Sequence, residues 1–85
     1  MFTTYILYSG KMDKFYIGYT SVNIEVRLQL HLANHKGFTA KAKDWLIVYT
    51  EQFATKAAAM QREKQLKAWK SNLRIRELID RSSIE

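Results

Sequence analysis

Tyrosines are unusually dense near the start of this sequence. In the segment YILYSGKMDKFYIGYT, four of the sixteen residues are tyrosines: Tyr5, Tyr8, Tyr16 and Tyr19. Phenylalanine, isoleucine or valine would suit a packed sheet surface equally well, so packing alone does not explain the hydroxyl groups. A phenol both donates and accepts hydrogen bonds, so converging phenols could serve a bound ligand. The alternative is that the rings are core residues whose hydroxyls lie at its rim.

The pairing of the two tyrosine-bearing runs decides which phenols converge. If they form a hairpin in which Tyr8 lies opposite Phe15, then Tyr5 lies opposite Gly18. Because strand side chains alternate between faces, Tyr5, Tyr16 and Gly18 then share one face. A glycine inside a strand often marks the close approach of a ligand or of another backbone. We therefore predict two phenols beside a position that carries no side chain.

A basic pair follows on a predicted helix. Arg27 and His31 are four residues apart, so they are neighbours on one helix face. They border an apolar stripe formed by Ile24, Leu28 and Leu32. Together the two side chains would bind an anion better than either would alone. The alternative is that the arginine extends to water and the histidine is structural.

A single carboxylate, Glu63, lies on the apolar side of a second predicted helix. It comes four residues after Ala59 and three before Leu66, so it does not lie on the opposite, solvent-facing side. One carboxylate can hold a hard divalent cation whose other ligands are water and phosphate. The alternative is an ordinary surface ion pair with Lys67, one helical turn further on.

Taken together, a tyrosine pair, an arginine, a histidine and one carboxylate are the parts needed to hydrolyse a phosphodiester. Such a reaction needs a group that positions water, a cation that neutralises the growing charge, and a metal that steadies the phosphate and the leaving oxygen. The formal net charge of +6, from 14 Lys and Arg against 8 Asp and Glu, favours a polyanionic partner. A basic protein without such a partner would carry the same charge.

The segment HKGFTAKAKDW interleaves lysines with aromatic residues, as surfaces that follow a nucleic-acid backbone often do. Its lysines, Lys36, Lys41 and Lys43, lie around Phe38 and Trp45. We expect this segment to contact a nucleic-acid strand. A solvated basic loop is the alternative.

These residues must be held by a small α+β fold. The expected elements are strands near residues 3–8 and 14–19, a helix within 21–34, a strand within 45–53, a long helix from about residue 55, and a short helix after residues 71–72. The order β-β-α-β-α-α favours a small three-stranded antiparallel sheet flanked by helices. With 85 residues, a single domain spanning residues 1–85 is expected.

Short polar side chains indicate where the helices begin. Ser21 or Asn23 can cap the first helix and Thr55 the second, because such side chains accept bonds from the free N–H groups of the first turn. The core face of the last helix is expected to comprise Leu73, Leu78, Ile75 and Ile79.

Composition excludes several kinds of site. There is no cysteine, which rules out disulfides, thiolate metal sites and cysteine nucleophiles. No apolar run approaches the roughly 20 residues that span a bilayer. The first ten residues, MFTTYILYSG, lack the basic region of a signal peptide. We therefore expect a cytoplasmic protein with no membrane partner.

Four short motifs in this order resemble the GIY-YIG nuclease superfamily, and within it the small standalone single-domain members. They are TTY at residues 3–5, YIG at 16–18, RLQLH at 27–31 and REKQLKAW at 62–69. Ten residues separate the first two motifs, as the opening hairpin of the family requires. TTY departs from the family pattern because Thr3 and Thr4 replace the glycine and isoleucine. The resemblance covers roughly residues 3 to 80.

The resemblance implies metal-dependent cleavage of DNA phosphodiester bonds, with DNA repair or recombination as the setting. Tyr5 would assist the attacking water, as a general base or by positioning it, and Tyr16 would orient the phosphate. Arg27 would stabilise the charge of the transition state, and His31 would lie near the scissile phosphate. Glu63 would bind a single Mg²⁺ or Mn²⁺ ion.

The resemblance also implies two further site residues, and two alternative functions remain open. Gly18 would leave room for the phosphate, and Asn72 would be a polar residue near the site. A partner protein could supply specificity, because a chain of 85 residues has little room for a separate targeting domain. The first alternative is a catalytically weak or inactive nucleic-acid-binding module on the same fold. The second is a basic protein that binds an acidic protein.

Overall fold

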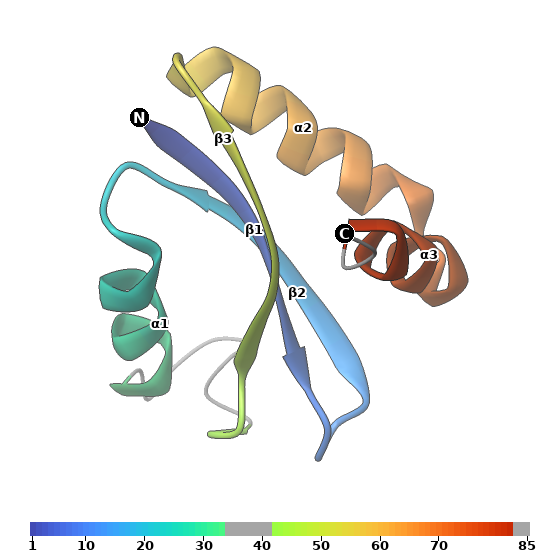
Figure 1. The fold of residues 1–85 in the computed structure, drawn as a ribbon. Helices are drawn as coiled ribbons and strands as arrows, with labels where there is room; N and C mark the ends of the chain where they lie inside the picture. Colours follow the sequence, from blue (N-terminus) through green and yellow to red (C-terminus); the bar gives the residue numbers. More distant parts are fainter. Residues whose placement is uncertain (34–41, 83–85) are drawn as a thin grey trace.

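The computed structural model describes residues 1–33 and 42–82 and shows an α+β fold within them (Figure 1). The elements are β1 (Phe2–Ser9), β2 (Lys14–Thr20), α1 (Ile24–Ala33), β3 (Leu46–Phe53), α2 (Lys56–Trp69) and α3 (Asn72–Ser82). This confirms the fold class and the element order expected from the sequence. In these described parts, no helix combines the length and the apolarity needed to cross a bilayer.

The three strands form one antiparallel sheet in the order β2-β1-β3, so β1 is central. In the hairpin Tyr8 pairs with Phe15 and Tyr5 with Gly18, which confirms the predicted register. A shift of register between Ile6 and Leu7 interrupts the pairing of β1 with β3. Since β1 is paired along both edges and covered on both faces, it carries most of the fully buried positions of the sheet.

The sheet separates two layers of helix. Figure 1 shows α1 on one face and both α2 and α3 on the other. Tyr5, Leu7 and Trp45 form a buried cluster with apolar residues of α1. Ile6, one position along β1, packs instead with Leu66 and Ile75 on the opposite face. The alternation of side chains along β1 therefore assigns each helix layer its own core, and it places Tyr5 on the α1 side.

Side-chain caps fix where α1 and α2 begin. The Asn23 side-chain oxygen accepts from the Glu25 N–H at 2.8 Å, and the Asn23 carbonyl accepts from the Arg27 N–H at 3.0 Å. Asn23 is therefore the cap of α1. Thr55 caps α2, since its hydroxyl accepts from the Ala58 N–H at 3.2 Å. Both starts agree with the sequence, and the first one sets the position of Arg27 one turn into α1.

The core face of α3 differs from the expectation at one residue. Ile75 is 4% exposed, and Leu78 and Ile79 pack against the same cluster, whereas Leu73 is 67% exposed. Residues three and four apart share a helix face, and Leu73 lies two positions before Ile75, on nearly the opposite side. The prediction that Leu73 is a core residue was wrong.

Replacing Ile75 with alanine should lower the free energy of unfolding by about 2–5 kcal/mol, because it removes a buried side chain and leaves a cavity. Leu73→Ala, on the same helix, should change it by no more than about 0.5 kcal/mol. Urea unfolding followed by circular dichroism measures both changes. Equal losses in the two variants would show that Leu73 also belongs to the core.

Candidate active site

A cavity of about 530 Å³ joins the two helix layers at the β2 side of the sheet. Its wall is built from β1, β2, the connection into α1, α1 itself and α2. Four predicted catalytic residues line it: Tyr5, Tyr16, Arg27 and Glu63. The structure therefore brings together side chains that lie up to 58 positions apart in the sequence, from residue 5 to residue 63.

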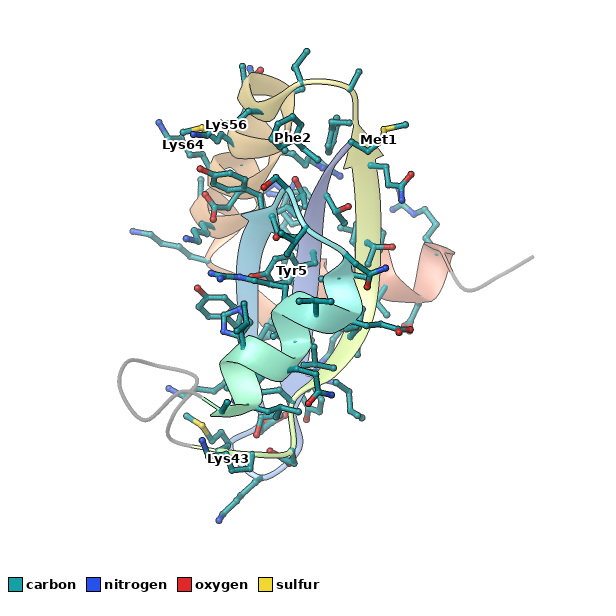
Figure 2. The ribbon with its side chains drawn as sticks, turned by 90° about the vertical axis from the view of Figure 1, so that its left-hand side faces the viewer. Met1, Phe2, Tyr5, Lys43, Lys56 and Lys64 are labelled. Carbon is teal, nitrogen blue, oxygen red and sulfur yellow. The ribbon has the colours of Figure 1, made fainter. Side chains whose placement is uncertain are left out.

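His31, the fifth predicted catalytic residue, lies directly behind the Tyr5 phenol. Its Nε2 is 2.8 Å from the Tyr5 hydroxyl, and Arg27 Nε donates to the same oxygen over a longer distance of 3.5 Å. The Tyr16 ring packs edge-on against His31, with centroids 5.0 Å apart. Tyr5 has no exposed surface and His31 is buried. Figure 2, with α1 in front, shows Tyr5 between that helix and the sheet.

Burial and the neighbouring charges shift the pKa values of this cluster. Loss of hydration raises the pKa of Tyr5, although the hydrogen bond from Arg27 acts in the opposite direction. Burial, together with the nearby Arg27 cation, lowers the pKa of His31. The bond to Tyr5 raises the pKa of Arg27, which therefore stays charged. Since Arg27 donates to the Tyr5 oxygen, the phenol can direct its own proton to Nε2 of a neutral His31.

Glu63 reaches the cavity from α2, with its side chain 18% exposed. Its Oε2 is 3.4 Å from Lys67 Nζ, so the predicted ion pair and the predicted position at the cavity are both present. The described residues contain no group of three or more His, Cys, Asp or Glu side chains that could hold a metal ion. One carboxylate fits only a cation that keeps most of its water, as Mg²⁺ does, and not a closed protein cage.

Gly18 borders the cavity, but the space beside it is already filled. A Cβ atom at this position would lie 2.6 Å from the Tyr5 hydroxyl oxygen and 2.8 Å from Tyr5 Cζ. Real Cβ atoms essentially never come so close to another heavy atom. Gly18 therefore leaves room for the phenol of Tyr5, and the expectation that it also leaves room for a phosphate stays a prediction.

Asn72 and Lys43, two further predicted binding residues, are not part of the cavity lining. Asn72 is exposed at the start of α3 and lines a separate hollow. Lys43 donates to the Leu32 carbonyl at 2.8 Å, near the end of α1. Figure 2 shows Lys43 and Lys56 at opposite ends of this face. Lys36 and Lys41 lie outside the described residues.

Lys56 and Tyr19 are among the cavity residues that the sequence analysis did not assign to the site. Lys56, the first residue of α2, lines the cavity together with Glu63. The seven-residue spacing is two helical turns and could have revealed this, because it places both side chains on one face. Tyr19 also lines the cavity, although the sequence analysis did not group it with Tyr5 and Tyr16. Lys56 adds a second cation to the wall that already carries Arg27.

Comparison with known proteins identifies the family. The sequence matches the family model described as GIY-YIG catalytic domain over residues 1–76. The chain belongs to the GIY-YIG family. This GIY-YIG domain is similar to the UPF0213 protein SH2523 of Staphylococcus haemolyticus (strain JCSC1435), with 33% identity over 73 residues that cover 84% of this chain and 87% of that protein. No solved structure gives a significant match. Membership confirms the predicted resemblance and indicates a nuclease-type function with a nucleic-acid substrate.

Gly18→Ala should lower the free energy of unfolding by about 1–3 kcal/mol, because the added methyl group would overlap the buried Tyr5 phenol. Gly10→Ala is the matched control: its Cβ would have Asp44 Oδ2 as nearest neighbour at 3.7 Å, an ordinary contact, so no loss is expected. Urea unfolding of both variants provides the measurement. A Gly18→Ala protein as stable as the control would refute the close contact.

The buried His31 should make stability depend on pH. Its pKa lies below the ordinary value of about 6.5, so the unfolded chain takes up this proton first as pH falls. The contribution of neutral His31 to the free energy of unfolding is therefore complete above about pH 6.5. It is lost as the pH drops toward the pKa of His31 in the folded protein. The free energy of unfolding in urea should be lower at about pH 5.5 than at about pH 7.5. This difference between the two pH values should be smaller in the His31→Gln variant. His35, present in both proteins, cancels in this comparison; an unchanged pH dependence would exclude His31.

Proposed function

We propose that this GIY-YIG domain is an endonuclease that hydrolyses DNA phosphodiester bonds with a single Mg²⁺ or Mn²⁺ ion, in DNA repair or recombination. The observation that supports this most directly is the cavity that Tyr5, Tyr16, Arg27 and Glu63 share, with His31 bonded to the Tyr5 hydroxyl behind its wall. The net charge of +6 favours the approach of DNA.

Arg27 provides the fixed positive charge. The bond to Tyr5 uses one of its five N–H donors, and the guanidinium lines the cavity while charged at any ordinary pH. Such a preorganised cation stabilises the negative charge that develops on a phosphate under attack. Lys56 adds charge to the same wall, and the half-buried Tyr16 offers a hydroxyl that can orient a phosphate oxygen.

Tyr5 requires a small rearrangement before it can act on water. It has no exposed surface, and its oxygen accepts the Arg27 bond. A phosphate that draws the guanidinium toward itself frees that oxygen. The attacking water then gives a proton to Tyr5 while the phenol proton passes to His31 Nε2. At the same time the water oxygen bonds to phosphorus, the bond to the leaving oxygen breaks, and the leaving oxygen takes a proton from solvent.

Glu63 would hold the divalent ion through its single carboxylate. When bound, such an ion neutralises phosphate charge and steadies the leaving oxygen. Because the described residues offer one carboxylate to this cavity, the remaining ligands would come from water and from the substrate itself. In the absence of an ion, Lys67 provides the compensating charge for Glu63.

Purified protein should nick supercoiled plasmid DNA when Mg²⁺ or Mn²⁺ is present. Glu63→Gln should abolish nicking yet unfold like the wild type, because its pair with Lys67 contributes only about 0.2–0.5 kcal/mol. Arg27→Ala should slow nicking by about 10²–10³-fold. Glu77→Gln, which changes an exposed carboxylate on α3, is the control and should leave the rate unchanged.

Other outcomes would support a different function. Wild-type protein that binds DNA tightly but nicks no substrate with either metal would be a nucleic-acid-binding module. Protein without any salt-sensitive affinity for nucleic acid would instead fit a basic partner of an acidic protein. If nicking appears only when a second protein is added, that partner supplies the substrate specificity.

A further inference from the structure

A second hollow, of about 300 Å³, lies beside the active-site cavity. Tyr16 of β2 lines both, so the two hollows adjoin at this residue. The apolar part of its wall includes Phe15 and Ile17 from β2 and Leu66 from α2. The polar part comes from the junction of α2 and α3: Lys67, Lys70, Ser71 and Asn72. An apolar wall with a cationic and amide-bearing rim is suited to a flat, polar-edged ring attached to an anion.

Lys70 occupies an unusual backbone conformation at this rim. It is the C-cap of α2, with φ 49° and ψ 32° in the left-handed region. Glycine is the favoured residue at such a position, because a Cβ atom strains the backbone there. The sequence nevertheless has a lysine, and that lysine lines the hollow. Lys70 therefore brings a positive charge to the rim of the hollow despite its strained backbone. A phosphate of a bound strand could reach that charge.

Lys67 connects the hollow with the neighbouring cavity. Its ammonium group pairs with Glu63, while the residue also lines the hollow. A strand whose phosphate lies near Arg27 and Glu63 could continue past Tyr16, which lines both hollows, toward Lys67 and Lys70. The charges thus continue along the path that a bound strand would take.

We propose that this hollow binds one unpaired base of the DNA strand, adjacent to the phosphate held in the active-site cavity. This inference rests on the proposed function and deepens it by naming the substrate class. The base packs against the Phe15 side of the hollow, its edge meets Asn72 and Ser71, and its phosphate meets Lys70. Bases that are splayed out of a helix are recognised by such combinations of aromatic and polar groups. Because a base paired in a duplex is unavailable, the preferred substrate has a single-stranded or distorted segment.

Fluorescence of 2-aminopurine tests the site directly. Short single-stranded DNA oligonucleotides carry this base at one position at a time and are titrated with protein in the absence of divalent metal. We expect quenching at one position well above that at the others, since one base enters the hollow and stacks. Equal quenching at all positions, or none, would overturn the proposal.

Two variants locate the quenching base. Asn72→Trp fills the mouth of the hollow and should abolish the position-specific quenching. Lys70→Gly removes the charge and relieves the left-handed strain, so the protein should melt at the same or a higher temperature. It should nevertheless bind the strand more weakly, with the slope of log affinity against log salt reduced by about 0.7.

Lys64→Ala is the matched control for Lys70→Gly, because it also removes one positive charge, from a residue of α2 that lies outside the hollow. If both variants lose affinity equally, the effect is general and the proposal fails. The two hypotheses also remain separable. Nicking without position-specific quenching refutes the base site alone, whereas position-specific quenching without nicking refutes the nuclease and supports the base site.

Discussion

Two neighbouring residues of the central strand hold the two halves of the site in place. The Thr4 hydroxyl is fully buried and donates to the Ala59 carbonyl of α2 at 2.8 Å. The Tyr5 hydroxyl faces the opposite side and bonds His31 of α1 at 2.8 Å. Burying a hydroxyl without a partner is costly, so each bond constrains the helix that supplies the partner. Glu63 follows Ala59 by one helical turn, and Arg27 precedes His31 by one turn. The two hydrogen bonds therefore also set the positions of these two candidate site residues.

This arrangement gives a structural meaning to the TTY segment. Thr4 stands where the family pattern has an apolar residue, and here it anchors α2 through a hydrogen bond. The sheet order is equally necessary. Because β2 is an edge strand, α2 can pack on the far face and still bring Glu63 to a cavity that also contains Arg27. A wider sheet beyond β2 would separate the two residues.

Features with a local signature could be predicted from the sequence. The hairpin register follows from its short loop and alternating pattern, and side-chain chemistry indicates Thr55 as one cap and Ser21 or Asn23 as the other. The side chains that pack against a given residue in the folded protein could not be predicted. A strand pattern places Gly18 on a face, but it does not show that the Tyr5 phenol occupies the gap. Asn72 was assigned by analogy, and the αL turn at Lys70 directs it to a neighbouring hollow.

The balance of charge around Glu63 has a consequence for how metal and nucleic acid would bind. One carboxylate faces Lys67 within ion-pair distance and shares its cavity with Arg27 and Lys56. A divalent cation approaching this site alone would meet net positive charge and would compete with an ammonium group. A phosphate reverses that balance, because it neutralises the cations and supplies the oxygen ligands that the protein lacks. On the proposed function, the ion and the strand therefore bind better together than separately, and metal affinity depends on substrate.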